Sequence, residues 1–142
     1  MLRLANDGVA MVKIKVIVEG AAESEAVVSL NPISFFGDID PKTGVVKDPN
    51  SNIKGVSIAG KVLVVPGTRG STVGSYVLYA LSKNNVAPKA IVVKSAEPIL
   101  ITGCILGGIP LVTSSEDYLF NGQVGGKRVK IDPSSSSLEI VQ

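Results

Sequence analysis

Apolar and polar residues follow one another in short blocks along this chain, and most of the blocks have the length of a strand. After Met11, the segment 12–20 (VKIKVIVEG) alternates apolar and charged residues, which is the pattern of a half-buried strand. Residues 25–30 (EAVVSL) predict the next strand. Residues 61–65 (KVLVV) form a continuous apolar run, which is typical of a strand covered on both faces, and Pro66 ends it because proline lacks the N–H group that a ladder needs.

One main helix is predicted at about residues 71–83. Its apolar positions recur at the spacing of one helical face, at Val73, Val77, Ala80 and Leu81. Further strands are predicted at the segments 89–94, 98–106, 109–113, 127–131 and 137–141, and residues 114–120 predict at most one helical turn. These elements indicate the α/β class, with a mixed sheet or barrel-like sandwich and one main helix.

The polar segment 31–55 connects two of these strands, and its prolines, glycines and turn-forming residues exclude a long helix. Phe35 and Phe36 within it predict that the segment packs against the domain. Asp38 and Asp40 suggest two alternatives, a ligand pair for a hard cation or an ordinary turn, and the Asp-Pro-x-x-Gly pattern favours the turn.

The composition is unusually apolar for a chain of 142 residues, because 45% of the residues are hydrophobic and 18% are charged. This balance predicts a face that a partner buries. The net charge of +2 is spread along the chain, which argues against nucleic acid as a partner. The apolar run 99–112 is too short and too rich in glycine to cross a membrane, and a single cysteine is typical of a reducing compartment, so the chain is expected in the cytoplasm.

The length fits a single domain. We assign that domain to residues 12–142, and residues 1–11 are interpreted as a disordered or non-native extension because they show no clear periodicity.

The chain contains no histidine, which excludes a Ser-His-Asp triad and an imidazole base. One cysteine without histidine cannot hold zinc, and it cannot hold an iron-sulfur cluster. No metal site is therefore predicted in this chain. Cys104 lies within an apolar run and is interpreted as a small buried residue and not as a nucleophile.

The loop between the strand at 61–65 and the predicted helix contains Arg69, Gly70 and Ser71. A helix start presents unpaired N–H groups and a partial positive charge, and arginine binds carboxylate or phosphate through two parallel hydrogen bonds. The loop can therefore bind an anion. The structural alternative is that Ser71 caps the helix while Arg69 is solvated.

Four stretches carry a resemblance to a known family: SFFGDIDPKTGVVKD, GKVLVVPGTRGSTVGSYVLYAL, APKAIVVKSAEPILITGCILGGIPLV and GKRVKID. They resemble the small subunits of archaeal-type phosphomevalonate dehydratases, in the aconitase X group. The resemblance covers about residues 12–141 and implies a swivelling β/β/α domain. This domain would close over a large subunit that carries a [4Fe-4S] cluster.

The resemblance also implies a reaction, the dehydration of (R)-5-phosphomevalonate to trans-anhydromevalonate 5-phosphate on the mevalonate route to isoprenoids. It implies that Ser71 is the proton acceptor and that Arg69 and Gly70 bind the substrate. Thr72 stands where many members of the group have cysteine. This departure leaves open a hydro-lyase subunit for another small hydroxy acid. A Ser71 that only caps the helix leaves open a non-catalytic module that binds a small ligand or a protein.

Overall fold

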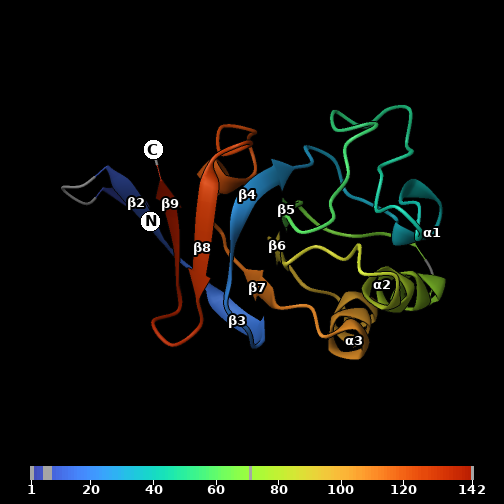
Figure 1. The fold of residues 1–142 in the computed structure, drawn as a ribbon. Coiled ribbons are helices and arrows are strands. Elements are labelled where there is room, and N and C mark those ends of the chain that lie inside the picture. Colours follow the sequence, from blue (N-terminus) through green and yellow to red (C-terminus); the bar gives the residue numbers. More distant parts are fainter. Residues whose placement is uncertain (1, 5–7, 71, 142) are drawn as a thin grey trace.

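The computed structural model describes residues 2–4, 8–70 and 72–141, which form a strongly curved sheet with helices on one side (Figure 1). The strands of these residues follow the order β1-β2-β9-β8-β4-β5-β6-β7-β3. Their bounds are β1 (Leu2–Leu4), β2 (Val9–Lys13), β3 (Lys15–Val18), β4 (Ala22–Val28), β5 (Val62–Val64), β6 (Ala90–Val93), β7 (Leu111–Thr113), β8 (Arg128–Asp132) and β9 (Ser137–Val141). Strands β4 to β7 are parallel and the other pairs are antiparallel, so the predicted α/β class with a mixed, barrel-like sheet is confirmed.

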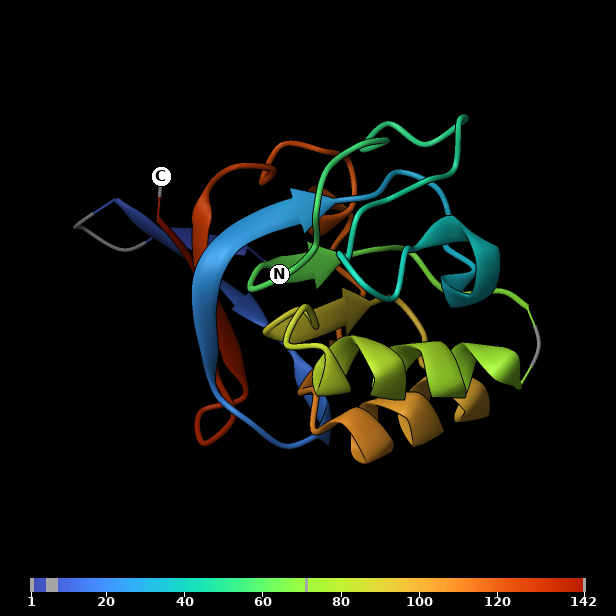
Figure 2. The same cartoon turned by 45° about the vertical axis from the view of Figure 1, so that its right-hand side comes forward.

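The predicted strand at 12–20 is in fact two strands, and the break between them explains the barrel shape. Strands β2 and β3 are separated only by Ile14, which is buried, yet they lie near opposite ends of the strand order. One continuous piece of chain therefore brings the two ends of the sheet together (Figure 2). Part of the N-terminal extension also joins the sheet, because β1 pairs with β2 and β2 begins at Val9.

The helices are α1 (Phe35–Asp38), α2 (Val73–Lys83) and α3 (Pro98–Gly107), with a single 3-10 turn, η1 (Asp117–Leu119). The predicted turn at 114–120 is thereby confirmed. None of the helices in the described ranges has the length and apolar character needed to cross a bilayer.

Helix α2 confirms the predicted main helix, and its buried face agrees with the predicted stripe in part. The side chains that pack toward the sheet include Leu78 and Leu81, whereas Val73 is exposed. The helix begins at Val73, and Thr72 occupies its N-cap position.

The predicted strand at 98–106 is wrong, because these residues form α3. Glu97 caps this helix by accepting a hydrogen bond from the Leu100 amide, and Gly108 ends it in the left-handed conformation. An apolar run of this length fits a buried strand as well as a helix, since no 3.6-residue period distinguishes them. Gly103 lets α3 approach α2, since a Cβ at this position would collide with the Leu78 side chain. The prediction of one main helix is corrected accordingly.

The sheet separates two hydrophobic cores, and successive residues of β5 and β6 point into different ones. Val62 and Val92 belong to the core inside the curved sheet, with Ile131 and Leu138. Leu63 and Ile91 belong to the core beneath the helices and the segment 31–55. Burial on both faces is the physical reason for the continuous apolar runs of these strands. Phe35 is part of the second core, whereas Phe36 is exposed, so one of the two phenylalanines anchors the segment.

Candidate functional site

The predicted site residues lie where the parallel strands end. The chain leaves β4, β5 and β6 at the same edge of the sheet, and the segments 29–34, 65–70 and 94–97 follow these ends (Figure 1). Ligands of α/β sheets commonly bind outside the carboxyl ends of the strands. The position of the Arg69 loop therefore agrees with a binding role.

Backbone hydrogen bonds hold the loop after β5 against the segment after β4. Ile33 and Thr68 form a parallel bridge, which extends the pairing of β4 with β5. The Ile33 amide donates to the Gly67 carbonyl at 3.2 Å, and the Arg69 amide donates to the Ile33 carbonyl at 3.0 Å. These two hydrogen bonds to Ile33, in the segment after β4, hold the backbone of the loop at Arg69 in place.

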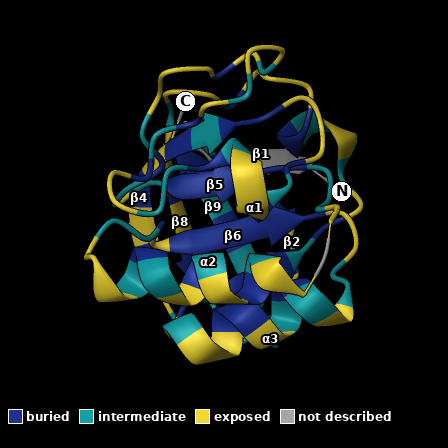
Figure 3. Cartoon of the chain, turned by 90° about the vertical axis from the view of Figure 1, so that its right-hand side faces the viewer, coloured by how far each residue is buried: buried dark blue, intermediate teal, exposed yellow. Residues whose placement is uncertain are grey.

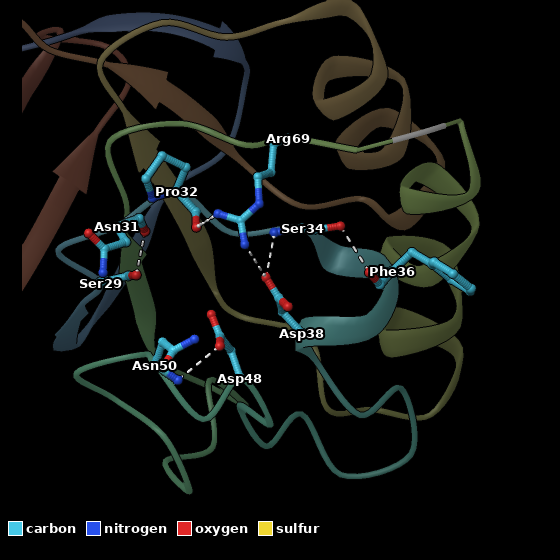
Figure 4. Close-up of polar contacts among 9 residues, drawn as sticks. All are labelled: Ser29, Asn31, Pro32, Ser34, Phe36, Asp38, Asp48, Asn50 and Arg69. Atoms are coloured by element: carbon cyan, nitrogen blue, oxygen red, sulfur yellow. Dashed lines mark hydrogen bonds and ion pairs between the residues drawn. The ribbon is translucent and has the colours of Figure 1, made fainter.

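The guanidinium group of Arg69 turns back onto the same neighbouring segment (Figure 4). Its Nη1 donates to the Pro32 carbonyl at 2.9 Å, and its Nη2 lies 3.6 Å from Asp38 Oδ2. The same carboxylate oxygen accepts a hydrogen bond from the Ser34 amide at 2.8 Å. The Arg69 side chain is 55% exposed, whereas that of Asp38 is largely buried. Asp38 therefore holds Arg69 from the protein side, and part of the guanidinium faces solvent.

Gly70 is required by its conformation and by its surroundings. Its φ angle is 114°, in the region that favours glycine, and an added Cβ would lie 2.8 Å from Ser34 Oγ. The Ser34 hydroxyl donates to the Phe36 carbonyl at 2.9 Å, which keeps it in this position.

Ser71, the predicted proton acceptor, lies outside the described residues. Its neighbours Gly70 and Thr72 are described, and they mark the end of the loop and the start of α2. The N-cap position belongs to Thr72, which makes no side-chain cap hydrogen bond. Thr72 itself has the helical angles φ −55° and ψ −21°. The alternative in which Ser71 caps α2 falls on a residue outside the described ranges and stays a prediction.

A further contact ties this loop to α3. Thr68 Oγ1 donates to Glu97 Oε1 at 2.9 Å, and the same oxygen accepts the Leu100 amide at 3.2 Å. The sequence did not identify Ser34 or Glu97 as part of the site. An acidic residue directly before Pro98 is the pattern of a helix start, and it was the available signal for Glu97.

Basic side chains also gather farther along the same edge. Lys13, Lys15 and Lys94 line a hollow of about 330 Å³ together with hydroxyl groups that include that of Ser114. Lys94 Nζ lies 3.3 Å from Asp117 Oδ1, so one of these charges is partly balanced. The edge thus offers positive charge at two places, at this hollow and at Arg69.

The sequence favours an ordinary turn over a cation site at Asp38 and Asp40, and both side chains make contacts of another kind. Asp38 faces Arg69, and Asp40 Oδ1 accepts a hydrogen bond from the Lys42 amide in a turn. Within the described ranges, no three residues of the types histidine, cysteine, aspartate and glutamate are grouped to hold a metal ion. Cys104 is buried as predicted, and burial raises the pKa of its thiol from the ordinary value of 9.0 to about 12.

The fold and the edge loop together define a barrel-like α/β domain that presents a basic, glycine-containing loop at the ends of its parallel strands. The chain belongs to the aconitase X swivel domain family, whose model matches residues 11–140.

Named relatives match most of the chain. The phosphomevalonate dehydratase small subunit of Pyrococcus horikoshii is 52% identical over 127 residues, which cover 89% of this chain and 90% of the relative. That of Methanococcoides burtonii is 46% identical and covers 92% and 98%. Among solved structures, the crystal structure of Thermococcus kodakaraensis aconitase X in its holo-form matches with a TM-score of 0.86 at 49% identity, covering 93% of this chain and 98% of that one.

Proposed function

We propose that this chain is the small subunit of a two-subunit hydro-lyase of the cytoplasm. The enzyme dehydrates (R)-5-phosphomevalonate to trans-anhydromevalonate 5-phosphate in the mevalonate pathway. The observation that carries the proposal is the match, over nearly the full length, to small subunits named for this dehydratase. The Arg69 loop at the edge of the sheet supplies a place on this chain for an anionic substrate.

In the proposed reaction, the Ser71 oxygen takes a proton from the carbon beside the substrate carboxylate. The electron pair left behind forms the carbon-carbon double bond, and the hydroxyl on the next carbon leaves with its own electron pair as hydroxide. The proton taken by Ser71 is passed on through solvent, so that the net loss from the substrate is one water molecule. Negative charge develops at the carboxylate as the proton is removed, and fixed positive charge nearby lowers the barrier. Arg69 and the amide groups at the start of α2 are sources of such charge next to Ser71 in the chain.

Asp38 limits what Arg69 can contribute. A serine hydroxyl is a weak base at neutral pH, so its deprotonation needs strongly positive surroundings. The charge of Arg69 is partly balanced by Asp38 at 3.6 Å. We infer that Arg69 orients an anionic group of the substrate through its rigid planar group, and that the large subunit provides most of the remaining positive charge.

The [4Fe-4S] cluster of the proposed enzyme belongs to the large subunit. The described part of this chain offers no group of ligands that fits a cluster, and its one cysteine, on α3, is buried with a neutral thiol. We therefore assign no step of the cluster's chemistry to the residues of this chain.

The test is reconstitution of the complex from this chain and the large subunit of the same organism. The account predicts turnover of (R)-5-phosphomevalonate by the complex and none by either subunit by itself. A complex that assembles but does not turn over this substrate contradicts the proposal.

A second candidate substrate is a small hydroxy acid without a phosphate group. Thr72 is the reason to test such a substrate, because many members of the group have cysteine at this position. Thr72 adjoins the proposed proton acceptor and is exposed at the start of α2. Assaying the same complex with phosphorylated and unphosphorylated hydroxy acids distinguishes the two substrates.

A further inference from the structure

Helix α3 carries no charged side chain on any of its sides, and Thr102 is the only hydroxyl-bearing residue in it. Residues 98–107 include no aspartate, glutamate, lysine or arginine. Helix α2, which packs against α3, has its first charged residue at Lys83, the last residue of the helix. Helices on the surface of a protein normally carry charged residues on their outer face, whereas a helix that is apolar all round is normally buried.

The two helices are nonetheless on the outside of this chain (Figure 3). Tyr76 is 69% exposed, Ile105 is 63% exposed and Leu106 is 51% exposed. The outer side of the pair is also hollowed. A cavity of about 260 Å³ is lined by Thr72 and Tyr76 at the start of α2 and by residues of α3 that include Leu106.

Aromatic residues are concentrated on this side of the molecule. The chain has three tyrosines and three phenylalanines. Three of these six, Phe36, Tyr76 and Tyr79, are exposed, and all three lie on α1 or α2, which pack together. Exposed tyrosine and phenylalanine are enriched in protein interfaces, where they contribute a large share of the binding energy.

We propose that this helical face, defined by Val73, Tyr76, Tyr79, Ile105 and Leu106, is the surface on which the large subunit docks through an apolar surface of its own. The proposal rests on the proposed function, since the large subunit is part of it. Burial in the complex explains why α3 has no charged residue, and why the chain as a whole is so apolar.

The position of the site identifies the large subunit, and not a second copy of this chain, as the occupant. Thr72 follows the proposed proton acceptor directly in the chain, and it lines the hollow between the helices. An acceptor that acts on substrate held by another subunit has to lie at the border with that subunit. The apolar surface and the reaction site therefore belong to one continuous contact area.

The test is calorimetric titration of the full chain with the large subunit of the same organism. The variants are Tyr79→Gln, Ile105→Gln and Leu106→Gln, none of which changes a residue of the proposed site. The control is Val141→Gln, at a comparably exposed apolar position on β9, across the sheet from the helices. Each helix variant is expected to raise the Kd by about tenfold or more, and the control by less than about twofold.

Thermal melts of the free variants, expected to match the unaltered chain, show that a weaker Kd reflects the surface and not misfolding. Unchanged Kd values for all three helix variants overturn the proposal. Sedimentation experiments that show a dimer of this chain, and loss of the dimer in the same variants, also overturn the proposal, because a second copy then occupies the helical face.

The binding readout needs no turnover. A complex that binds through this face but lacks dehydratase activity therefore refutes the proposed reaction and leaves the docking surface intact.

Discussion

At the scale of single residues, the described part of the candidate site is a set of contacts between the loop after β5 and the segment after β4. Arg69 is bound through its amide, through Nη1 and through its ion pair with Asp38. Ser34 connects the segment after β4 with the loop after β5, because its amide donates to Asp38 and its hydroxyl lies against Gly70. These contacts hold the residues on one side of Ser71 in place, and α2 holds those on the other side.

Replacing Arg69 by lysine is expected to raise the KM of the complex by roughly tenfold, with a smaller effect on kcat. Lysine keeps the charge but cannot bind Pro32 and the substrate with one planar group. The matched control is Arg128→Lys, because Arg128 forms a 2.8 Å ion pair with Glu23 on β4, in the antiparallel part of the sheet. Steady-state kinetics of both variants make the comparison. A KM unchanged in Arg69→Lys removes this side chain from the substrate contacts.

Cys104 is expected to resist thiol reagents in the folded chain at pH 8 and to react once the chain is unfolded. Burial raises its pKa to about 12, so the native thiol is protonated. The folded state favours the protonated form, and this contribution to stability is complete below pH 9. It decreases as the pH rises from 9 toward 12, because the unfolded chain then ionises first. Labelling with a chromogenic disulfide checks the first expectation, and rapid labelling of the native chain contradicts it.

At the scale of elements, the sequence predicted strands correctly where a short apolar run is bounded by turn-forming or charged residues. It failed where an apolar run fits a buried strand and a buried helix equally well. The runs around β5 and β6 are short and are bounded by proline, glycine or lysine, so their assignment as buried strands was correct. The same rule misassigned residues 98–106, because the helix they form has no charged residue on any side. In α2, the apolar stripe gave the helix and part of its buried face, since Leu81 is buried and Val77 packs against the core, whereas Val73 is exposed.

The contact between α2 and α3 depends on Gly103, and this gives a stability prediction. Gly103→Ala is expected to lower the free energy of unfolding by about 1 to 3 kcal/mol, because its Cβ would collide with Leu78 and lie 3.1 Å from the Ser75 Cα. Gly74→Ala is the matched helical control, since its Cβ would meet only ordinary contacts, the nearest at 3.9 Å. The control is expected to be neutral or stabilising by up to about 1 kcal/mol. Urea denaturation measures both, and equal stabilities of the two variants contradict this account of the helix packing.

At the scale of the whole molecule, composition predicted a buried partner face, but it could not say where such a face would lie. The location depends on which side of α2 and α3 meets the sheet, and this is decided by packing between segments far apart in the chain. The contacts of Arg69 were unpredictable for the same reason, since Pro32 and Asp38 reach it only through the pairing of β4 with β5. The membership of the aconitase X swivel domain family, in contrast, was evident from local motifs and is confirmed over residues 11–140.

The central claim is that this chain contributes the proton acceptor to a site completed by the large subunit. The most direct measurement is the turnover of (R)-5-phosphomevalonate by the complex that contains Ser71→Ala. The account predicts a loss of kcat of about 100-fold or more, with the Kd for the large subunit unchanged. Turnover close to that of the unaltered complex would contradict the claim.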